Sequence, residues 1–151
     1  MASTAASKRD ILVTFSWFLE LDGVAWGQFR ECSGLSSEHE IIEAKLTSKG
    51  GKDFVYKTPG RLKWGDITLK RGMNAEMDIW KWRKDVEDGK IDKARKNGSI
   101  VMYDYDFKEV ARWNFVQAWP SKASGPSLNT GSSDAAIEEL TLVHEGIERV
   151  K

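Results

Sequence analysis

Residues 59–82 read PGRLKWGDITLKRGMNAEMDIWKW, and this stretch holds the transition around which the chain is organised. It predicts a turn at Pro59-Gly60 and then a strand. The apolar alternation of that strand slips by one residue at Gly65-Asp66, which indicates a bulge or a bend. Beyond the strand the apolar period changes from two residues to about 3.6, and Asn74 is the expected helix N-cap. We therefore predict one strand-to-helix transition in a chain otherwise built from strands.

The predicted helix covers residues 75–88 and stops at Gly89. Its apolar stripe has the i, i+3, i+7 spacing of one helix face and consists of Ile79, Trp82 and Val86. The opposite side is charged, so we expect a surface helix that lies on a sheet. Trp80 sits at the margin of the stripe. We interpret it as a residue that covers the edge of the core, rather than as an exposed docking side chain.

Strands are predicted on both sides of this stretch, because apolar residues alternate there with period two. The expected elements are a long strand over 11–21, a turn at 22–23, strands over 26–31 and 38–45, a flexible polar tip at 48–52 with a return arm, a charged loop over 90–96, a hairpin over 99–105 and 109–119, a polar loop over 120–133 and a last strand over 135–149. This amounts to about seven strands and one helix. It predicts a mainly β (α+β) fold, an antiparallel β-sandwich or small barrel with one surface helix.

Composition limits the classes of function. Lys plus Arg and Asp plus Glu both number 23, so the formal net charge is zero and lacks the basic excess typical of nucleic-acid or anionic-membrane binding. The length of 151 residues predicts a single domain over 1–151, with residues 1–9 as a flexible N-terminal arm. No apolar signal-peptide core or membrane-spanning run is visible, so we expect synthesis in the cytoplasm without a signal peptide.

Candidate chemical groups are few and scattered. His39 and His144 lie far apart in sequence, and Cys32 is the single cysteine, which excludes an intrachain disulfide. We interpret Cys32 as a buried structural thiol. The acidic pair Asp104 and Asp106 lacks the further ligands of a calcium loop, and the Gly-Gly-Lys sequence at 50–52 lacks the rest of a phosphate loop. The sequence therefore predicts a protein that is not an enzyme, with no metal and no cofactor.

Four groups of residues, taken together and in order, resemble a known family. They are Phe29-Arg30-Glu31-Cys32-Ser33-Gly34-Leu35; Pro59-Gly60 with Ile67-Thr68-Leu69-Lys70-Arg71-Gly72, Trp80 and Trp82; Trp113-Asn114-Phe115 with Ala118-Trp119-Pro120 and Lys122; and Ile137-Glu138-Glu139-Leu140 with His144-Glu145-Gly146. The chain resembles the tail-tube family of contractile phages, which also supplies the inner tubes of phage-tail-like contractile injection systems. The family often has a Gly in the turn that here reads Asp106-Phe107-Lys108.

The resemblance implies a structural subunit without enzymatic activity or cofactor. Six copies would form a ring in which strands of neighbouring subunits join into one large barrel, and stacked rings would form a hollow conduit for cargo. Implied partners are the chain itself, a sheath protein, baseplate or spike and tube-terminating proteins, and luminal cargo or a tape-measure protein. The particle would be cytoplasmic, membrane-anchored or released from the cell.

The resemblance also implies two surfaces. The implied contact with the next ring consists of Lys49, Gly50, Gly51 and Lys52, together with the N-terminal arm. The implied sheath-facing side of the helix carries Lys81, Lys84, Asp85 and Asp88. Two other interpretations stay open at this stage. One is a ring protein of a type VI secretion system that carries effectors, and the other is a Trp-rich carbohydrate-binding β-sandwich, since the chain has seven Trp residues.

Overall fold

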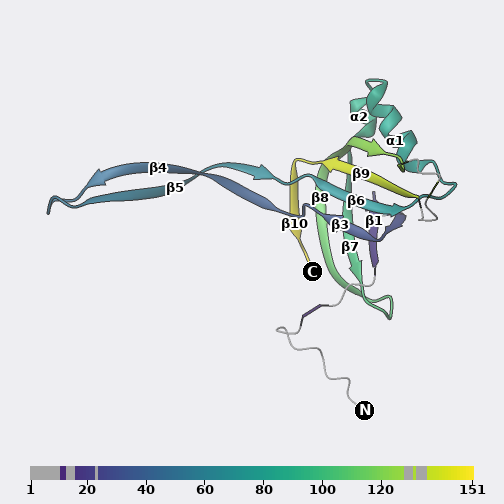
Figure 1. The fold of residues 1–151 in the computed structure, drawn as a ribbon, viewed down its shortest axis with the longest axis horizontal. Coiled ribbons are helices and arrows are strands. Elements are labelled where there is room, and N and C mark those ends of the chain that lie inside the picture. Colours follow the sequence, from purple (N-terminus) through teal and green to yellow (C-terminus); the bar gives the residue numbers. More distant parts are fainter. Residues whose placement is uncertain (1–10, 13–15, 23, 128–130, 132–135) are drawn as a thin grey trace, which may run out of the picture.

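The computed structural model describes residues 11–12, 16–22, 24–127, 131 and 136–151. Figure 1 shows a body of strands with two helices on one side and a long two-stranded extension leaving it. The elements are β1 (Ser16–Leu21), β2 (Val24–Phe29), β3 (Glu31–Ser33), β4 (Ser37–Thr47), β5 (Asp53–Trp64), β6 (Ile67–Gly72), α1 (Asp78–Glu87), α2 (Ile91–Ala94), β7 (Lys96–Tyr103), β8 (Glu109–Ser124), β9 (Ile137–Val143) and β10 (Gly146–Arg149). The predicted mainly β, antiparallel fold is confirmed, and the described residues hold more strands than expected and a second helix.

The body is one antiparallel sheet in the order β2-β1-β7-β8-β9-β6-β3, with β10 paired to β8 as well. The 16-residue strand β8 spans the whole body, because one of its edges pairs with β7 and the other pairs first with β10 and then with β9. The two ends of the sheet, β2 and β3, are adjacent in the chain and separated only by Arg30. They do not pair with each other, so the described strands of a single chain do not close into a barrel.

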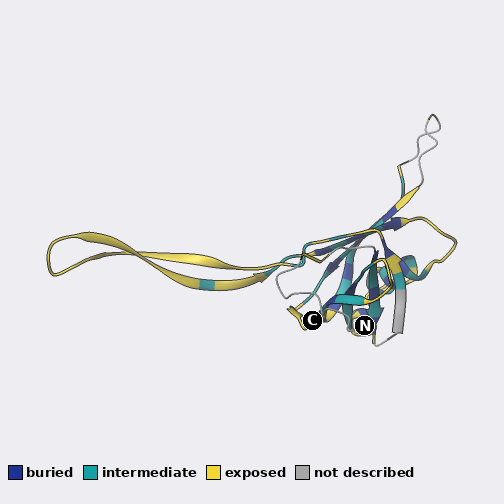
Figure 2. Ribbon diagram, turned by 90° about the horizontal axis from the view of Figure 1, so that it is seen from below, coloured by how far each residue is buried: buried dark blue, intermediate teal, exposed yellow. Residues whose placement is uncertain are grey.

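The core lies inside the curled sheet and under α1. Leu19, Phe29, Leu69, Phe115 and Leu140 are almost completely buried within it. Figure 2 shows this burial concentrated in the body, while the extension is coloured as exposed along nearly its whole length. Burying such side chains stabilises each by roughly 1.5–3 kcal/mol, so the body has its own source of stability and the extension does not.

The apolar stripe predicted for the helix is confirmed. Ile79 and Trp82 are buried and Val86 packs on the core, while Trp80 covers the core margin and donates a hydrogen bond from Nε1 to Glu138 at 2.9 Å. The predicted stop at Gly89 is also confirmed, since this residue has the left-handed φ of 78° that favours glycine after a helix.

Two details of the helical region were predicted wrongly. The helix begins at Asp78 with Met77 as its N-cap, because the Asn74 side chain instead accepts a hydrogen bond from the Glu76 amide within the preceding loop. The charged loop expected over 90–96 contains the short helix α2. The Trp82 indole donates to the Ala94 carbonyl at 2.6 Å and ties α2 to α1, a contact that hydropathy does not show.

Three strand boundaries also differ from the predictions. Pro59-Gly60 is not a turn but lies inside β5, where an edge of the two-stranded extension tolerates a proline. Residues 120–124 continue β8 rather than opening a polar loop, and the missing proline amide falls at a register shift between Pro120 and Lys122. The expected last strand is divided at His144-Glu145 into β9 and β10. Of the strand predicted over 11–21, residues 16–21 form β1, and residues 13–15 lie outside the described residues.

Candidate functional site

The most unusual surface is the extension formed by β4 and β5, here called the ribbon. Its two strands have 11 and 12 residues and pair only with each other among the described strands. Every residue of β4 is exposed, and in β5 only Gly60 and Trp64 are partly covered. An isolated two-stranded hairpin is marginally stable in water, and two open edges are a liability for a protein that stays alone.

The strand register divides the ribbon into two unlike faces. Residues directly opposite one another share a face, and successive pairs alternate between faces. Three such pairs build an apolar face: Leu46 with Phe54, Ala44 with Tyr56, and Ile42 with Thr58. The alternate pairs on the other face are more polar: Thr47 with Asp53, Lys45 with Val55, and Glu43 with Lys57. The large apolar side chains are 46–57% exposed.

The turn at the ribbon tip is closed by its own hydrogen bonds. The Ser48 amide donates to the Lys52 carbonyl at 2.8 Å, and the Gly51 amide donates to the Ser48 carbonyl at 2.9 Å. The expected ring-contact residues Lys49, Gly50, Gly51 and Lys52 therefore share one exposed turn at the far end of the ribbon. The ammonium groups of Lys49 and Lys52 are the only side-chain charges in this turn.

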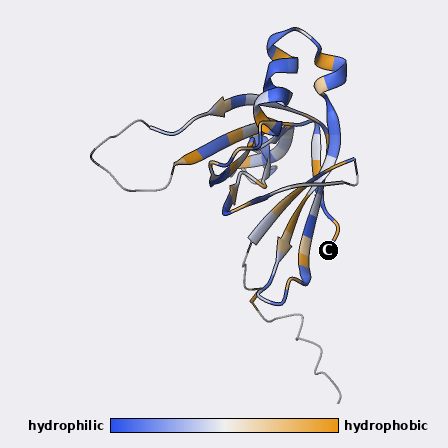
Figure 3. Ribbon diagram, turned by 90° about the vertical axis from the view of Figure 1, so that its right-hand side faces the viewer, coloured by the Kyte–Doolittle hydropathy of each residue, from blue (hydrophilic) through white to orange (hydrophobic). Residues whose placement is uncertain are grey.

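The expected sheath-facing residues share the outer side of α1. Lys81, Lys84 and Asp88 are exposed and Asp85 is half-buried. Lys84 and Asp88 form an ion pair of 3.5 Å whose side chains stay 65% and 43% exposed, so it adds little stability. In Figure 3 most residues of α1 and α2 have the blue of hydrophilic residues, with a few hydrophobic residues in orange.

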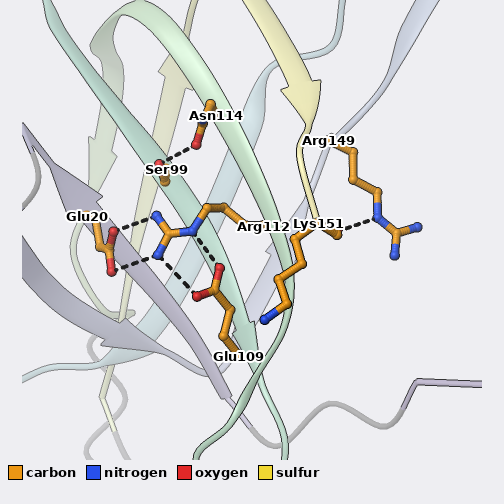
Figure 4. Close-up of polar contacts among 7 residues, drawn as sticks. All are labelled: Glu20, Ser99, Glu109, Arg112, Asn114, Arg149 and Lys151. Atoms are coloured by element: carbon orange, nitrogen blue, oxygen red, sulfur yellow. Dashed lines mark hydrogen bonds and ion pairs between the residues drawn. The ribbon is translucent and has the colours of Figure 1, made fainter. Parts of the chain in front are cut away.

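A polar cluster joins β1, β8 and the last residues of the chain. The Arg112 guanidinium donates to Glu20 at 2.7 Å and to Glu109 at 2.5 Å (Figure 4). Hydrogen bonds to Glu20 and then to Glu109 raise the pKa of Arg112 well above its ordinary range. The Arg112 amide also donates to the Lys151 carbonyl, to which Arg149 Nε donates at 2.8 Å. The contacts of Arg112 with Glu20 link β1 to β8.

The groups weighed for chemistry are not brought together. Among the described residues, no group of three or more His, Cys, Asp or Glu side chains is placed to hold a metal ion. Cys32 is half-buried on β3, and burial raises the pKa of its thiol to about 12, which opposes formation of a thiolate nucleophile. Asp104 caps its own turn by accepting hydrogen bonds from the Asp106 and Lys108 amides, both at 2.9 Å.

Comparison with known proteins identifies the family of this chain. Residues 13–148 match the family described as T4-like virus tail tube protein gp19. The chain belongs to this tail tube family. The fold class and the resemblance read from the sequence are thereby confirmed. No curated protein sequence matches the chain. None of the helices in the described part of the chain has the length and apolarity needed to cross a membrane.

Solved structures share the tail tube fold of this chain. A chain from the PVC sheath-tube complex of an extracellular contractile injection system, in its extended state, has a TM-score of 0.75 and 22% identity, covering 97% of this chain and 98% of that chain. A chain from the PVC sheath/tube terminator has a TM-score of 0.73 and 21% identity, with coverage of 96% and 100%. Hcp1 from Flavobacterium johnsoniae has a TM-score of 0.54 and 16% identity, with coverage of 90% and 95%. At these identities the likeness is one of fold.

Proposed function

We propose that this chain is the subunit of the inner tube of a contractile tail or injection system. In this proposal residues 1–151 form one tail-tube domain, six copies close into a ring by joining their strands, and stacked rings enclose a conduit for cargo. Membership of the tail tube family supports the proposal, as does the shared fold with chains from PVC sheath-tube and terminator structures. The role is structural, without enzymatic activity or cofactor.

The single observation that carries the proposal is the ribbon. Its apolar face holds Ile42, Leu46, Phe54 and Tyr56 in water, with no cover from the described part of the chain. Exposed apolar surface of this kind marks an interaction site, and open strand edges are relieved by pairing with another chain. A second copy of the chain is the partner that a tube provides at every position.

The two remaining surfaces then receive roles within the same proposal. The ribbon tip with Lys49 to Lys52 contacts the adjacent ring, because it is the point farthest from the body (Figure 1). The charged side of α1, with Lys81, Lys84, Asp85 and Asp88, faces the sheath and presents two positive and two negative side chains to it. Baseplate or spike proteins and a terminator are proposed at the tube ends. The particle is assembled in the cytoplasm and stays there, is anchored at a membrane or is released.

Two alternatives have less support. One is an effector-carrying ring of a type VI system: a solved type six secretion system protein shares the fold at a TM-score of 0.58, below the 0.75 of the PVC sheath-tube chain. A carbohydrate-binding sandwich needs exposed Trp faces, and none of the six Trp residues with described burial is exposed. Trp17 and Trp113, for example, pack against each other with ring centroids 5.8 Å apart.

The test compares assembly of three proteins by negative-stain electron microscopy and sedimentation. Wild-type protein is expected to form rings or tubes with a central hole. Leu46→Ser combined with Phe54→Ser removes one opposed pair from the apolar face and is expected to stay unassembled. Lys45→Ser combined with Val55→Ser is the matched control, because this adjacent pair lies on the other face, and it is expected to assemble.

Two results would overturn the proposal. One is a wild-type protein that stays monomeric at high concentration even when baseplate components are supplied to nucleate it. The other is equal assembly of the apolar-face variant and the wild type, since the ribbon face would then play no part in the association.

A further inference from the structure

Three sequence segments without a role so far meet where the ribbon joins the body. They are the Ser33-Gly34-Leu35 segment before β4, the Gly65-Asp66 step between β5 and β6, and the His144-Glu145-Gly146 segment between β9 and β10. Far apart in sequence, they form one joint at the ribbon root, here called the root joint. It is the place through which any rotation of the ribbon against the body must pass, since both ribbon strands end there.

The peptide groups of Gly65 are held from two sides at this joint. Its amide donates to the Ser36 carbonyl at 2.9 Å, and Ser36 in turn donates from its amide to the Gly34 carbonyl at 2.8 Å. Its carbonyl lies 2.9 Å from Nε2 of His144. A carbonyl oxygen only accepts, so Nε2 carries the hydrogen and donates. The first contact ties Gly65 to the residue that precedes β4, and the second ties it to the body.

Close packing leaves the root joint little room to move. A Cβ placed on Gly34 would lie 1.8 Å from the Asp66 carbonyl oxygen, and one placed on Gly65 would lie 2.2 Å from the Ser36 hydroxyl oxygen. The His144 ring also stacks obliquely near Trp64, the last residue of β5, with centroids 6.0 Å apart. The backbones therefore approach as closely as glycine permits, and the imidazole fills the remaining side.

We propose that His144 is a positioning residue that fixes the direction of the ribbon relative to the body. Its hydrogen bond to Gly65 and its ring contact with Trp64 are side-chain links from the β9–β10 corner to the ribbon root. Nδ1 of His144 is buried and has no partner among the described residues, so the ring is held by Nε2 and by packing alone. Removing the donor leaves the Gly65 carbonyl without this link and lets the root rotate.

The length of the ribbon makes its direction sensitive to this one contact. Twelve residues of β5 at about 3.3 Å each give a lever of about 40 Å, so a swing of about 10° displaces the tip by about 7 Å. The consequence for assembly rests on the proposed function: a tip that must meet a fixed site on a neighbouring copy assembles better when its direction is set beforehand.

The test measures ribbon direction in dilute, unassembled protein. Spin labels are attached at Gly50→Cys on the tip and Glu87→Cys on α1, in a Cys32→Ala background, and the distance distribution is recorded by pulsed electron resonance. His144→Phe keeps a ring but removes the donor. His39→Phe is the matched control, because His39 is exposed on β4. We expect the His144→Phe distribution to broaden by about 7 Å, as for a 10° swing, and the control to match the parent.

A distribution for His144→Phe as narrow as that of the parent would overturn the inference. Should this variant not fold, Gly65→Ala tests the joint from its other side, because the new Cβ displaces Ser36, while Gly72→Ala adds a Cβ in open space. An unchanged distribution in Gly65→Ala would likewise refute a directing joint. The measurement needs no tubes, so a wild type that fails to assemble would count against the proposed function and leave this result independent.

Discussion

The Arg71–Glu138 pair under α1 is the charged contact on which the body should depend most. The side chains of Arg71 and Glu138 are only 4% and 1% exposed, and Arg71 Nε donates to Glu138 at 3.0 Å. Glu138 also accepts from the Trp80 indole at 2.9 Å, and Arg71 reaches Asp78 at 2.8 Å. Burial by itself lowers the pKa of Arg71, but hydrogen bonds to Asp78 and Glu138 outweigh it and the pKa is raised. The guanidinium therefore stays charged.

We predict that Glu138→Gln lowers the free energy of unfolding by about 3 kcal/mol. Removing one partner of a buried ion pair destabilises by about 3–5 kcal/mol, because the other charge stays buried without compensation. The lower figure applies since the glutamine oxygen still accepts one hydrogen bond and Asp78 still faces Arg71. The glutamine NH2 group is a donor, and it then faces the N–H donor of either Arg71 or Trp80. For a chain of this length the loss corresponds to a fall in Tm of roughly 6–12 °C.

The assay is urea unfolding followed by Trp fluorescence, with a thermal scan as a second measure. Glu139→Gln is the control, because Glu139 is the next residue on β9, points to the other face and forms no ion pair with Arg71. It should change stability by less than about 0.5 kcal/mol. A loss of unfolding free energy below about 1 kcal/mol in Glu138→Gln, at an unchanged m-value, would refute the reasoning that the pair is desolvated and that each buried charge needs the other.

Three further outcomes are expected. Gly34→Ala should destabilise the chain more than Gly51→Ala. Both residues have a left-handed φ, but only a Cβ at position 34 would press against a backbone carbonyl. Equal losses of unfolding free energy in chemical denaturation would exclude a contribution from this steric clash. Glu109→Gln should lose less stability on acidification than the wild type. Hydrogen bonds from Arg112 lower the pKa of Glu109 below 4.5, so the stabilisation from ionised Glu109 is present above that value and is lost as pH falls through the lowered pKa. Urea midpoints of both proteins at pH 7 and below pH 4 will measure the difference. Phe107→Gly should raise Tm slightly, because it relieves about 0.5–1 kcal/mol of backbone strain at φ 57°. A lower Tm would show that the exposed phenyl ring stabilises the protein by more than this strain costs.

Local patterns predicted the elements whose neighbours are close in sequence. The stripe of Ile79, Trp82 and Val86 located α1, because helix burial follows a period of 3.6 whatever lies beneath. The slip at Gly65-Asp66 likewise marked the break between β5 and β6. These signals are carried by consecutive residues and need no knowledge of tertiary contacts.

The errors fall where partners are distant or absent. Pro59-Gly60 looks like a turn, yet on a ribbon with open edges a proline interrupts nothing. Residues 120–124 look like a polar loop because their strand partner, β9, begins only at Ile137. The ribbon itself was divided into shorter pieces, since its mixed faces resemble an ordinary surface hairpin. Its matched pairs, such as Leu46 opposite Phe54, were the signal that would have shown its length.

The position of the root joint has a kinetic consequence for a chain that is synthesised from its N-terminus. The ribbon pairs β4 with β5 across a short turn, so it can form as soon as about 30 residues have emerged beyond β3. Gly65 meets His144 only after 79 more residues have been made. Until then any hairpin formed by β4 and β5 is only marginally stable and has no fixed direction relative to the body. During translation the ribbon is therefore synthesised before the contact that fixes its direction. A nascent chain on the ribosome exposes an apolar strand pair that is not yet oriented to add in register to a growing ring.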